Sequence, residues 1–348
     1  MNNPLNNEVK NITIDQLLPG DILGFKGNHD DKISRLIMYL TNGSDVSHGA
    51  IFVQNKDNVL AESGDGGIHS HKMFDADDGR EVYVLRHNDA DSNGVEQIVP
   101  IAKDYVLQNL PYPYSDLILL GLILLFKKNV TKKIISKPVV EFMCLVAAEL
   151  KTIVEQQKTS GKHTMVCSSF VYQCYLDASK EYPNLKLNVK NGDIGFTEHL
   201  LFDGTNATSN VSLFDLFDEY VSSHKEEFES GLYANKNLVS ATKFRTKDDI
   251  LTDLERQLIN EENETDYVLM GGEFSVIIDF VRAIKDIVEA LGILLKGNVS
   301  FEEMMKNARD QQAMFVTPND LINHLTNAKL IGIAKVRCDD ARYDDNFK

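Results

Sequence analysis

Two short segments of the sequence carry residue types suited to nucleophilic chemistry. Ser47-His48-Gly49 opens the apolar run 50–53, and Cys167-Ser168-Ser169 opens a helical pattern. At a helix N-terminus, unpaired backbone N–H groups and the helix dipole favour a thiolate over a thiol. Histidine is the usual base for such a thiol. Cys167 and His48 are therefore our candidate nucleophile and base.

Glu62 is the candidate third member of this group. The sequence predicts a hairpin in which the strand starting at His48 is followed by the polar turn 55–58 and the strand 59–62. A carboxylate beside His48 would hold the second ring nitrogen and stabilise the imidazolium. Each of the three residues also has a plain structural interpretation: a buried thiol, a structural histidine and a solvated carboxylate at a strand end.

The elements around these residues are predicted as a small sheet followed by helices. A Pro19-Gly20 turn precedes a strand that reaches residue 25, and apolar residues at helical spacing predict a helix over 33–40. Two further strands are expected at 67–71 and 81–85. The apolar run 117–126 is half the length of a membrane span, so it is expected to be a buried core helix, with a membrane-surface helix as the alternative.

Six segments, in this order along the chain, resemble a known family, the circularly permuted papain-like hydrolases of the NlpC superfamily. This is the branch that includes the YiiX-like bacterial proteins and lecithin:retinol acyltransferase. The segments are Pro19-Gly20-Asp21-Ile22, Ser47-His48-Gly49, Leu60-Ala61-Glu62, Pro111-Tyr112-Pro113-Tyr114, Cys167-Ser168-Ser169-Phe170-Val171 and Val316-Thr317-Pro318-Asn319-Asp320-Leu321. The permuted branch places the histidine before the cysteine, as this chain does.

The resemblance implies a fold and a catalytic triad. The expected fold class is α+β, with a permuted papain-like core made of a small antiparallel sheet or half-barrel packed on helices. Carried over by residue, Cys167 is the nucleophile, His48 the base and Glu62 the orienting member. The backbone N–H of Cys167 would contribute to an oxyanion hole. The resemblance covers about residues 15–200 and 315–335.

The chain is expected to contain a catalytic core and a helical insertion. We assign residues 1–200 and 313–348 to the core, and residues 201–312 to an insertion that covers the core, shapes substrate entry or binds a partner. Within the insertion, helices are expected at 212–229, 247–262 and 273–296, and another from Ser300. Thr317-Pro318 with Asp320 predicts the start of a further helix in the core.

Composition excludes some classes of function. The net charge of −16 argues against a nucleic-acid binder. The four cysteines do not have the spacing of a disulfide framework or a zinc set, so Cys144, Cys174 and Cys338 are expected to be reduced and structural. Met1–Glu8 lacks the pattern of a signal peptide. We expect cytoplasmic synthesis, no transmembrane helix, and any export by a signal-independent route.

Metal and cofactor motifs are weak in this sequence. His69 and His71 share a strand face and, with Asp65 or Asp75, could bind a metal, but a solvated strand face is the simpler interpretation. The sequence contains no phosphate loop of the form GxxxxGK[ST], no HExxH and no GxSxG. We therefore assign no metal and no cofactor.

The expected activity is acyl transfer through a thioester on Cys167. The first expected substrate is a lipid acyl ester at a membrane surface, because the apolar run 117–126 favours it slightly. The alternative is an amidase or peptidase that acts on peptidoglycan or isopeptide bonds. A second alternative is a non-catalytic binding module on a papain-like scaffold. An immunity or inhibitor protein is a possible partner for the insertion.

Overall fold

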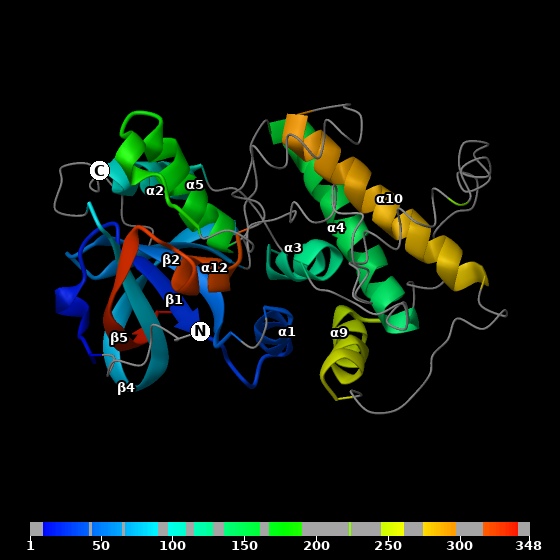
Figure 1. The fold of residues 1–348 in the computed structure, drawn as a ribbon, viewed down its shortest axis with the longest axis horizontal. Coiled ribbons are helices and arrows are strands. Elements are labelled where there is room, and N and C mark those ends of the chain that lie inside the picture. The colour runs from blue at the N-terminus through cyan, green and yellow to red at the C-terminus, as the bar shows by residue number, and fades with distance from the viewer. Residues whose placement is uncertain are drawn as a thin grey trace, which may run out of the picture.

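The computed structural model describes residues 10–41, 44–64, 67–89, 97–108, 115–127, 136–160, 167–189, 223, 245–260, 274–296 and 316–339. These residues form eight α-helices and a five-stranded antiparallel sheet, so the expected α+β class is confirmed. Figure 1 shows two halves side by side. The sheet half contains the strands with α2, α5 and α12, and the helical half contains α1, α3, α4, α9 and α10.

The sheet is built from β1 (Ile22–Lys26), β2 (Val46–Gln54), β3 (Val59–Gly64), β4 (Gly67–His87) and β5 (Ala328–Cys338). The strands follow in that order, and β1 also pairs with β4, so the first four strands close into a ring. The two strands expected at 67–71 and 81–85 are parts of the single strand β4, which corrects that prediction. β4 changes register between Asp75 and Arg80, which lets one strand pair with β3, β1 and β5.

The predicted hairpin of β2 and β3 is confirmed. Its turn contains Asp57 and Asn58 at positive φ, a conformation that these two residue types tolerate. The register sets Ala50 opposite Glu62. Because side chains alternate along a strand, His48 lies on the same face as Ala50 and diagonal to Glu62. Strand register therefore brings the histidine and the carboxylate together.

Three helices pack on the face of the sheet drawn towards the top and right in Figure 1. They are α2 (Ile98–Leu107), α5 (Cys167–Ser179) and α12 (Pro318–Asn323). As predicted, α5 begins at Cys167. The predicted start of α12 is also confirmed, because Thr317 caps the helix and forms a capping box with Asp320.

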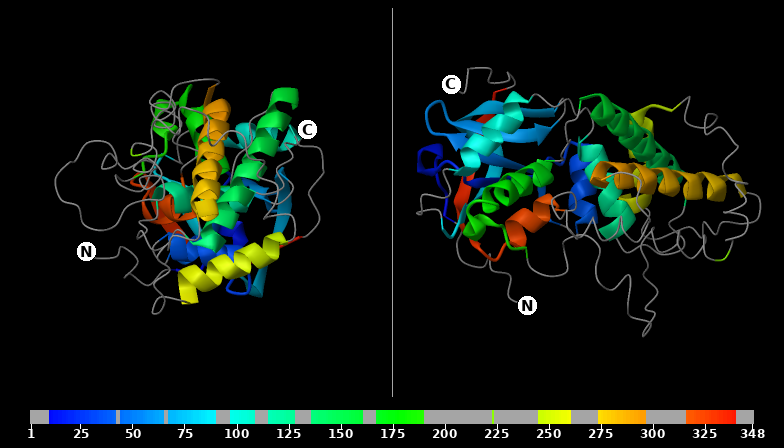
Figure 2. Two further views of the ribbon diagram at one scale, coloured as in Figure 1. Left: turned by 90° about the vertical axis from the view of Figure 1, so that its right-hand side faces the viewer. Right: turned by 90° about the horizontal axis from the view of Figure 1, so that it is seen from above.

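The helical half is formed by α1 (Lys32–Leu40), α3 (Ser115–Leu122), α4 (Lys137–Ser160), α9 (Lys247–Glu255) and α10 (Phe274–Lys296). α3 and α9 each continue as a π-helical turn, over Ile123–Lys127 and Arg256–Asn260. α10 lies along α4 in both views of Figure 2. The helices expected at 247–262 and 273–296 are confirmed, whereas those expected at 212–229 and from Ser300 fall outside the described residues, except for Ser223.

The apolar run that begins at Leu117 is buried in this half. The hydrophobic side chains from Leu117 to Leu125 are at most 3% exposed, and an added Cβ on Gly121 would lie 2.6 Å from a methyl of Val146. This confirms the expected core helix and contradicts a membrane-surface helix. Among the described residues, no helix has both the length and the apolar character needed to span a membrane. The proposed boundaries of the insertion stay a prediction; its described helices pack on α4.

Candidate active site

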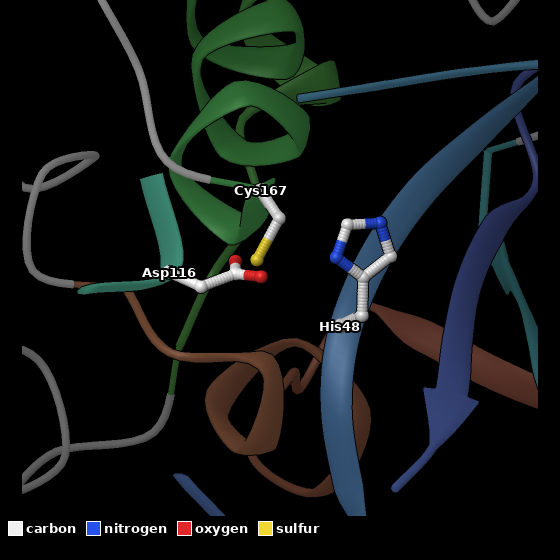
Figure 3. Close-up of side chains that lie close together, drawn as sticks. All are labelled: His48, Asp116 and Cys167. Atoms are coloured by element: carbon white, nitrogen blue, oxygen red, sulfur yellow. The ribbon is translucent and has the colours of Figure 1, made fainter. Parts of the chain in front are cut away.

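Cys167 and His48 meet where the sheet half adjoins the helical half. Cys167 is the first residue of α5 and is fully buried, and His48 comes from the start of β2 with 15% of its side chain exposed. Figure 3 shows one ring nitrogen of His48 directed towards the sulfur of Cys167. The donor atoms of His48, Cys167 and a third residue, Asp116, all lie within 4.8 Å of one another.

Glu62 holds the other nitrogen of the His48 ring. The Oε2 atom of Glu62 lies 2.7 Å from Nε2 of His48. The structure thus brings together all three residues singled out in the sequence. Burial favours the neutral ring, but Cys167 and Glu62 outweigh this effect and raise the pKa of His48 well above 6.5. This arrangement favours an imidazolium between two acidic groups.

Two further histidines surround Glu62. Its Oε1 atom lies 3.3 Å from Nε2 of His69 and 3.4 Å from Nε2 of His71. Burial alone would raise the pKa of the Glu62 carboxyl, but His48 and His69 hold it well below its ordinary value. His69 is buried and His71 is partly buried, so the expectation of a solvated strand face is wrong. The cause is the register that pairs Glu62 with His69.

Asp116 is a site residue that sequence reasoning missed. It stands in the first turn of α3, and its carboxylate lies beside the sulfur of Cys167 in Figure 3. The only sequence signal is an acidic residue that precedes an apolar run, which is an ordinary helix start. Its charge makes the surroundings of the thiol more negative, which disfavours anionic substrate groups near the sulfur.

Arg80 is a second residue that the sequence did not reveal. Its guanidinium carbon lies 5.3 Å from the ring centroid of Phe25, whose ring is in turn 5.7 Å from that of His48. Arg80 also donates to Oγ of Ser47, which accepts from Ser34 as well. Burial lowers the pKa of Arg80, and the charge of Glu62 opposes that effect. These contacts fix the start of β2, where His48 lies.

Hydrogen bonds and close packing hold α5 against the sheet and against the segment that leads into α12. The Tyr175 hydroxyl donates to the Gly20 carbonyl at 2.6 Å, and the Ser168 hydroxyl donates to the Val316 carbonyl at 2.6 Å. At Gly49, an added Cβ would lie 3.2 Å from a methyl of Leu321 on α12 and 3.7 Å from Cα of Ser168 on α5. The absence of a side chain there allows β2 to pass close to the N-terminal end of α5. The segment Pro111-Tyr112-Pro113-Tyr114 lies outside the described residues.

The remaining cysteines differ from Cys167 in their surroundings. All four are free thiols, which agrees with the reduced state expected for Cys144, Cys174 and Cys338. Burial raises the pKa of Cys144 and of Cys338 to about 12, and that of Cys174 well above its ordinary value. These three thiols are therefore neutral at physiological pH, and none of them shares the group formed by His48 and Asp116.

Two groups of described residues have donor atoms close enough to hold a metal ion. One is His48, Asp116 and Cys167, and the other is Glu62, His69 and His71. In the first group, the Glu62 contact at Nε2 gives His48 the orientation of a base in a nucleophilic site. Comparison with models of protein families, with curated proteins and with solved structures finds no match.

Proposed function

We propose that this protein is a cysteine hydrolase or acyltransferase on a permuted papain-like core, with Cys167, His48 and Glu62 as its catalytic triad. One observation carries the proposal: Glu62 holds Nε2 of His48 at 2.7 Å while the other ring nitrogen is directed towards Cys167. A nucleophile, a base and an orienting carboxylate are aligned in that order. The raised pKa of His48 supports an imidazolium beside Cys167.

The proposed reaction has two steps. The Cys167 sulfur attacks the substrate carbonyl, and His48 gives its proton to the leaving alcohol or amine, which yields a thioester and a neutral ring. Water, or an acceptor alcohol or amine, then transfers a proton to His48 and attacks the thioester, which releases the acyl product and restores the starting pair of the Cys167 sulfur and protonated His48. The backbone N–H of Cys167, at the start of α5, is a proposed donor to the oxyanion.

A lipid acyl ester remains the first substrate class to test, because the resemblance includes lipid acyltransferases. The apolar run 117–126 does not support it, because the hydrophobic side chains from Leu117 to Leu125 fill the helical core. The alternative is an amide of peptidoglycan or an isopeptide. Asp116 beside the thiol supports substrates that are neutral or cationic near the scissile bond. Export without a signal and a partner for residues 201–312 also stay predictions.

Full burial of Cys167 supports a second candidate, a binding module without catalysis. The side chain is 0% exposed, so a substrate reaches the sulfur only if neighbouring residues move. In the catalytic case, Cys167 reacts in spite of its burial because His48 activates it. In the binding case, Cys167 reacts no faster than the other three thiols.

Alkylation by iodoacetamide at neutral pH, followed cysteine by cysteine in the intact chain, separates the two candidates. We expect Cys167 to react at least tenfold faster than Cys338, and we expect His48→Gln to remove this difference. Cys174→Ala is the matched control, because it removes a buried thiol from the same helix. A Cys167 that labels as slowly as Cys338 in the unmodified protein would overturn the catalytic proposal.

Substrate class is tested with the same proteins. The chain and its Cys167→Ala variant are incubated separately with phospholipid liposomes and with peptidoglycan fragments, and products are identified by mass spectrometry. Fatty acid release that requires Cys167 supports the lipid ester. Cleavage of peptidoglycan fragments without lipid products assigns the amide instead. Rapid alkylation with neither product leaves the thiol assignment intact and excludes both of these substrates.

A further inference from the structure

A second group of polar side chains lies beside the proposed triad and shares Glu62 with it. The Oε1 atom of Glu62 on β3 is 3.3 Å from Nε2 of His69 and 3.4 Å from Nε2 of His71, both on β4. The three donor atoms lie within 4.8 Å of one another. The two imidazoles meet edge to face, with ring centroids 4.6 Å apart. Three donor groups therefore converge on one small volume.

The hydrogen bonding of His69 indicates that a cation lies between its ring and Glu62. Nδ1 of His69 lies 2.8 Å from the backbone carbonyl of Gly67, which only accepts, so Nδ1 carries a hydrogen. In the neutral ring, Nε2 then presents a lone pair to the oxygen of Glu62. Two lone pairs at 3.3 Å repel each other unless a cation lies between them. That cation is either a proton on the ring or a metal ion.

The distances fit a metal ion. Zn²⁺ binds histidine nitrogen and carboxylate oxygen at about 2.0–2.2 Å in tetrahedral geometry, which separates neighbouring ligand atoms by roughly 3.3–3.5 Å. Both measured separations from Glu62 agree with that spacing. A histidine ligand commonly donates its other N–H to a backbone carbonyl, as His69 does to Gly67. The remaining oxygen of Glu62 is likewise held by His48.

We propose that Glu62, His69 and His71 form a site for a divalent transition-metal ion of the zinc class, with a fourth position open to water. Two imidazoles and one carboxylate suit zinc and its neighbours better than Mg²⁺ or Ca²⁺, which prefer oxygen ligands. The side chains of Glu62 and His71 are 17% and 13% exposed, which leaves a route for the ion. The proposed metal site shares Glu62 with the proposed triad, but its geometry does not involve Cys167, so the two proposals are tested separately.

The experiment measures zinc binding to the full-length chain by calorimetry after treatment with a chelator. It is carried out in the Cys167→Ala variant, because His48, Asp116 and Cys167 form the other group of donors and would compete for the ion. We expect one bound zinc ion per chain. Adding His69→Gln or His71→Gln should weaken the affinity at least about tenfold, since loss of a ligand costs no less than loss of a supporting contact.

His29→Gln in the same background is the matched control, because His29 is exposed and remote in the sequence from the group. It should leave zinc affinity unchanged. Zinc should also raise the melting temperature of Cys167→Ala, because an ion that binds the folded state stabilises it. This second measurement needs no histidine variant, so it stays informative if His69→Gln fails to fold.

Three results would overturn the proposal. Zinc binding that survives both His69→Gln and His71→Gln would place the ion elsewhere. Absence of binding in Cys167→Ala, with binding in the unmodified chain, would assign the ion to the thiol group. Absence of binding in both proteins, with no change in melting temperature, would mean that the cation between Glu62 and His69 is a proton. The alkylation test of Cys167 is carried out after removal of metal with a chelator, so it is read separately from these results.

Discussion

The two halves of the molecule position their site residues by different means. His48 and Glu62 come from neighbouring strands of the sheet half, and backbone pairing sets their relation. Asp116 comes from α3 of the helical half, where packing of apolar side chains against α4 sets its position. Cys167 joins the two, because its side chain packs in the helical core while the rest of α5 packs on the sheet. The site therefore depends on hydrophobic packing in both halves.

The largest expected effect comes from a cavity in the helical core. Phe280 on α10 is 2% exposed, and Phe280→Ala should lower the free energy of unfolding by about 3–5 kcal/mol. Because the helical core is distinct from both hydrophobic clusters of the sheet half, hydrogen exchange should accelerate in α4 and α10 more than in β2 and β3.

Phe52→Ala is the matched substitution in the sheet half, since Phe52 is 0% exposed and loses the same side-chain atoms. Its exchange pattern should be the reverse, with faster exchange in the strands. Equal acceleration in both halves by either variant would mean that the two halves unfold as one unit, and the distinction drawn between them would fail.

Sequence patterns predicted the strand-borne part of the site better than the helix-borne part. A hairpin needs only a turn and side-chain alternation to place Glu62 near His48, and both are local in the sequence. The sequence does not predict Asp116 as a site residue, because the packing position of the apolar helix that follows it depends on residues distant in the sequence. His69 and His71 were assigned to solvent because the face of a strand that is buried depends on partners distant in the sequence. The papain-like core and the catalytic roles stay predictions.

The second prediction concerns a buried ion pair in the sheet half. Asp21, 1% exposed, accepts from Arg86 through both carboxylate oxygens, at 2.8 and 2.7 Å, and from the Leu18 N–H at 2.8 Å. Asp21→Asn leaves the guanidinium without its charged partner, so it should cost about 1.5–3 kcal/mol in denaturant unfolding. Asp78→Asn, in an exposed pair with Arg337, is the control and should cost less than about 1 kcal/mol. If Asp21→Asn and Asp78→Asn lower the free energy of unfolding by similar amounts, the buried ion pair does not stabilise the sheet half more than an exposed pair does.

The third prediction concerns the contribution of the helical half to the site. Asp116→Asn keeps the shape of the side chain and removes a charge beside Cys167. An anionic reagent should then approach the sulfur more easily, so the ratio of iodoacetate to iodoacetamide labelling rates at Cys167 should rise several-fold, which corresponds to about 1 kcal/mol. Asp104→Asn, on the exposed side of α2, should not change this ratio. An unchanged ratio in Asp116→Asn would show that α3 does not influence the thiol in solution.

The smallest effect is expected at the ion pair between Arg35 on α1 and Glu255 on α9. The Arg35 side chain is 28% exposed, and its hydrogen bond with Glu255 raises its pKa. Water screens such a pair, so Arg35→Gln should cost no more than about 1 kcal/mol. A double-mutant cycle with Glu255→Gln measures the coupling, which added salt should reduce. A coupling above about 2 kcal/mol would mean that charge, and not apolar packing alone, fixes α9 against α1.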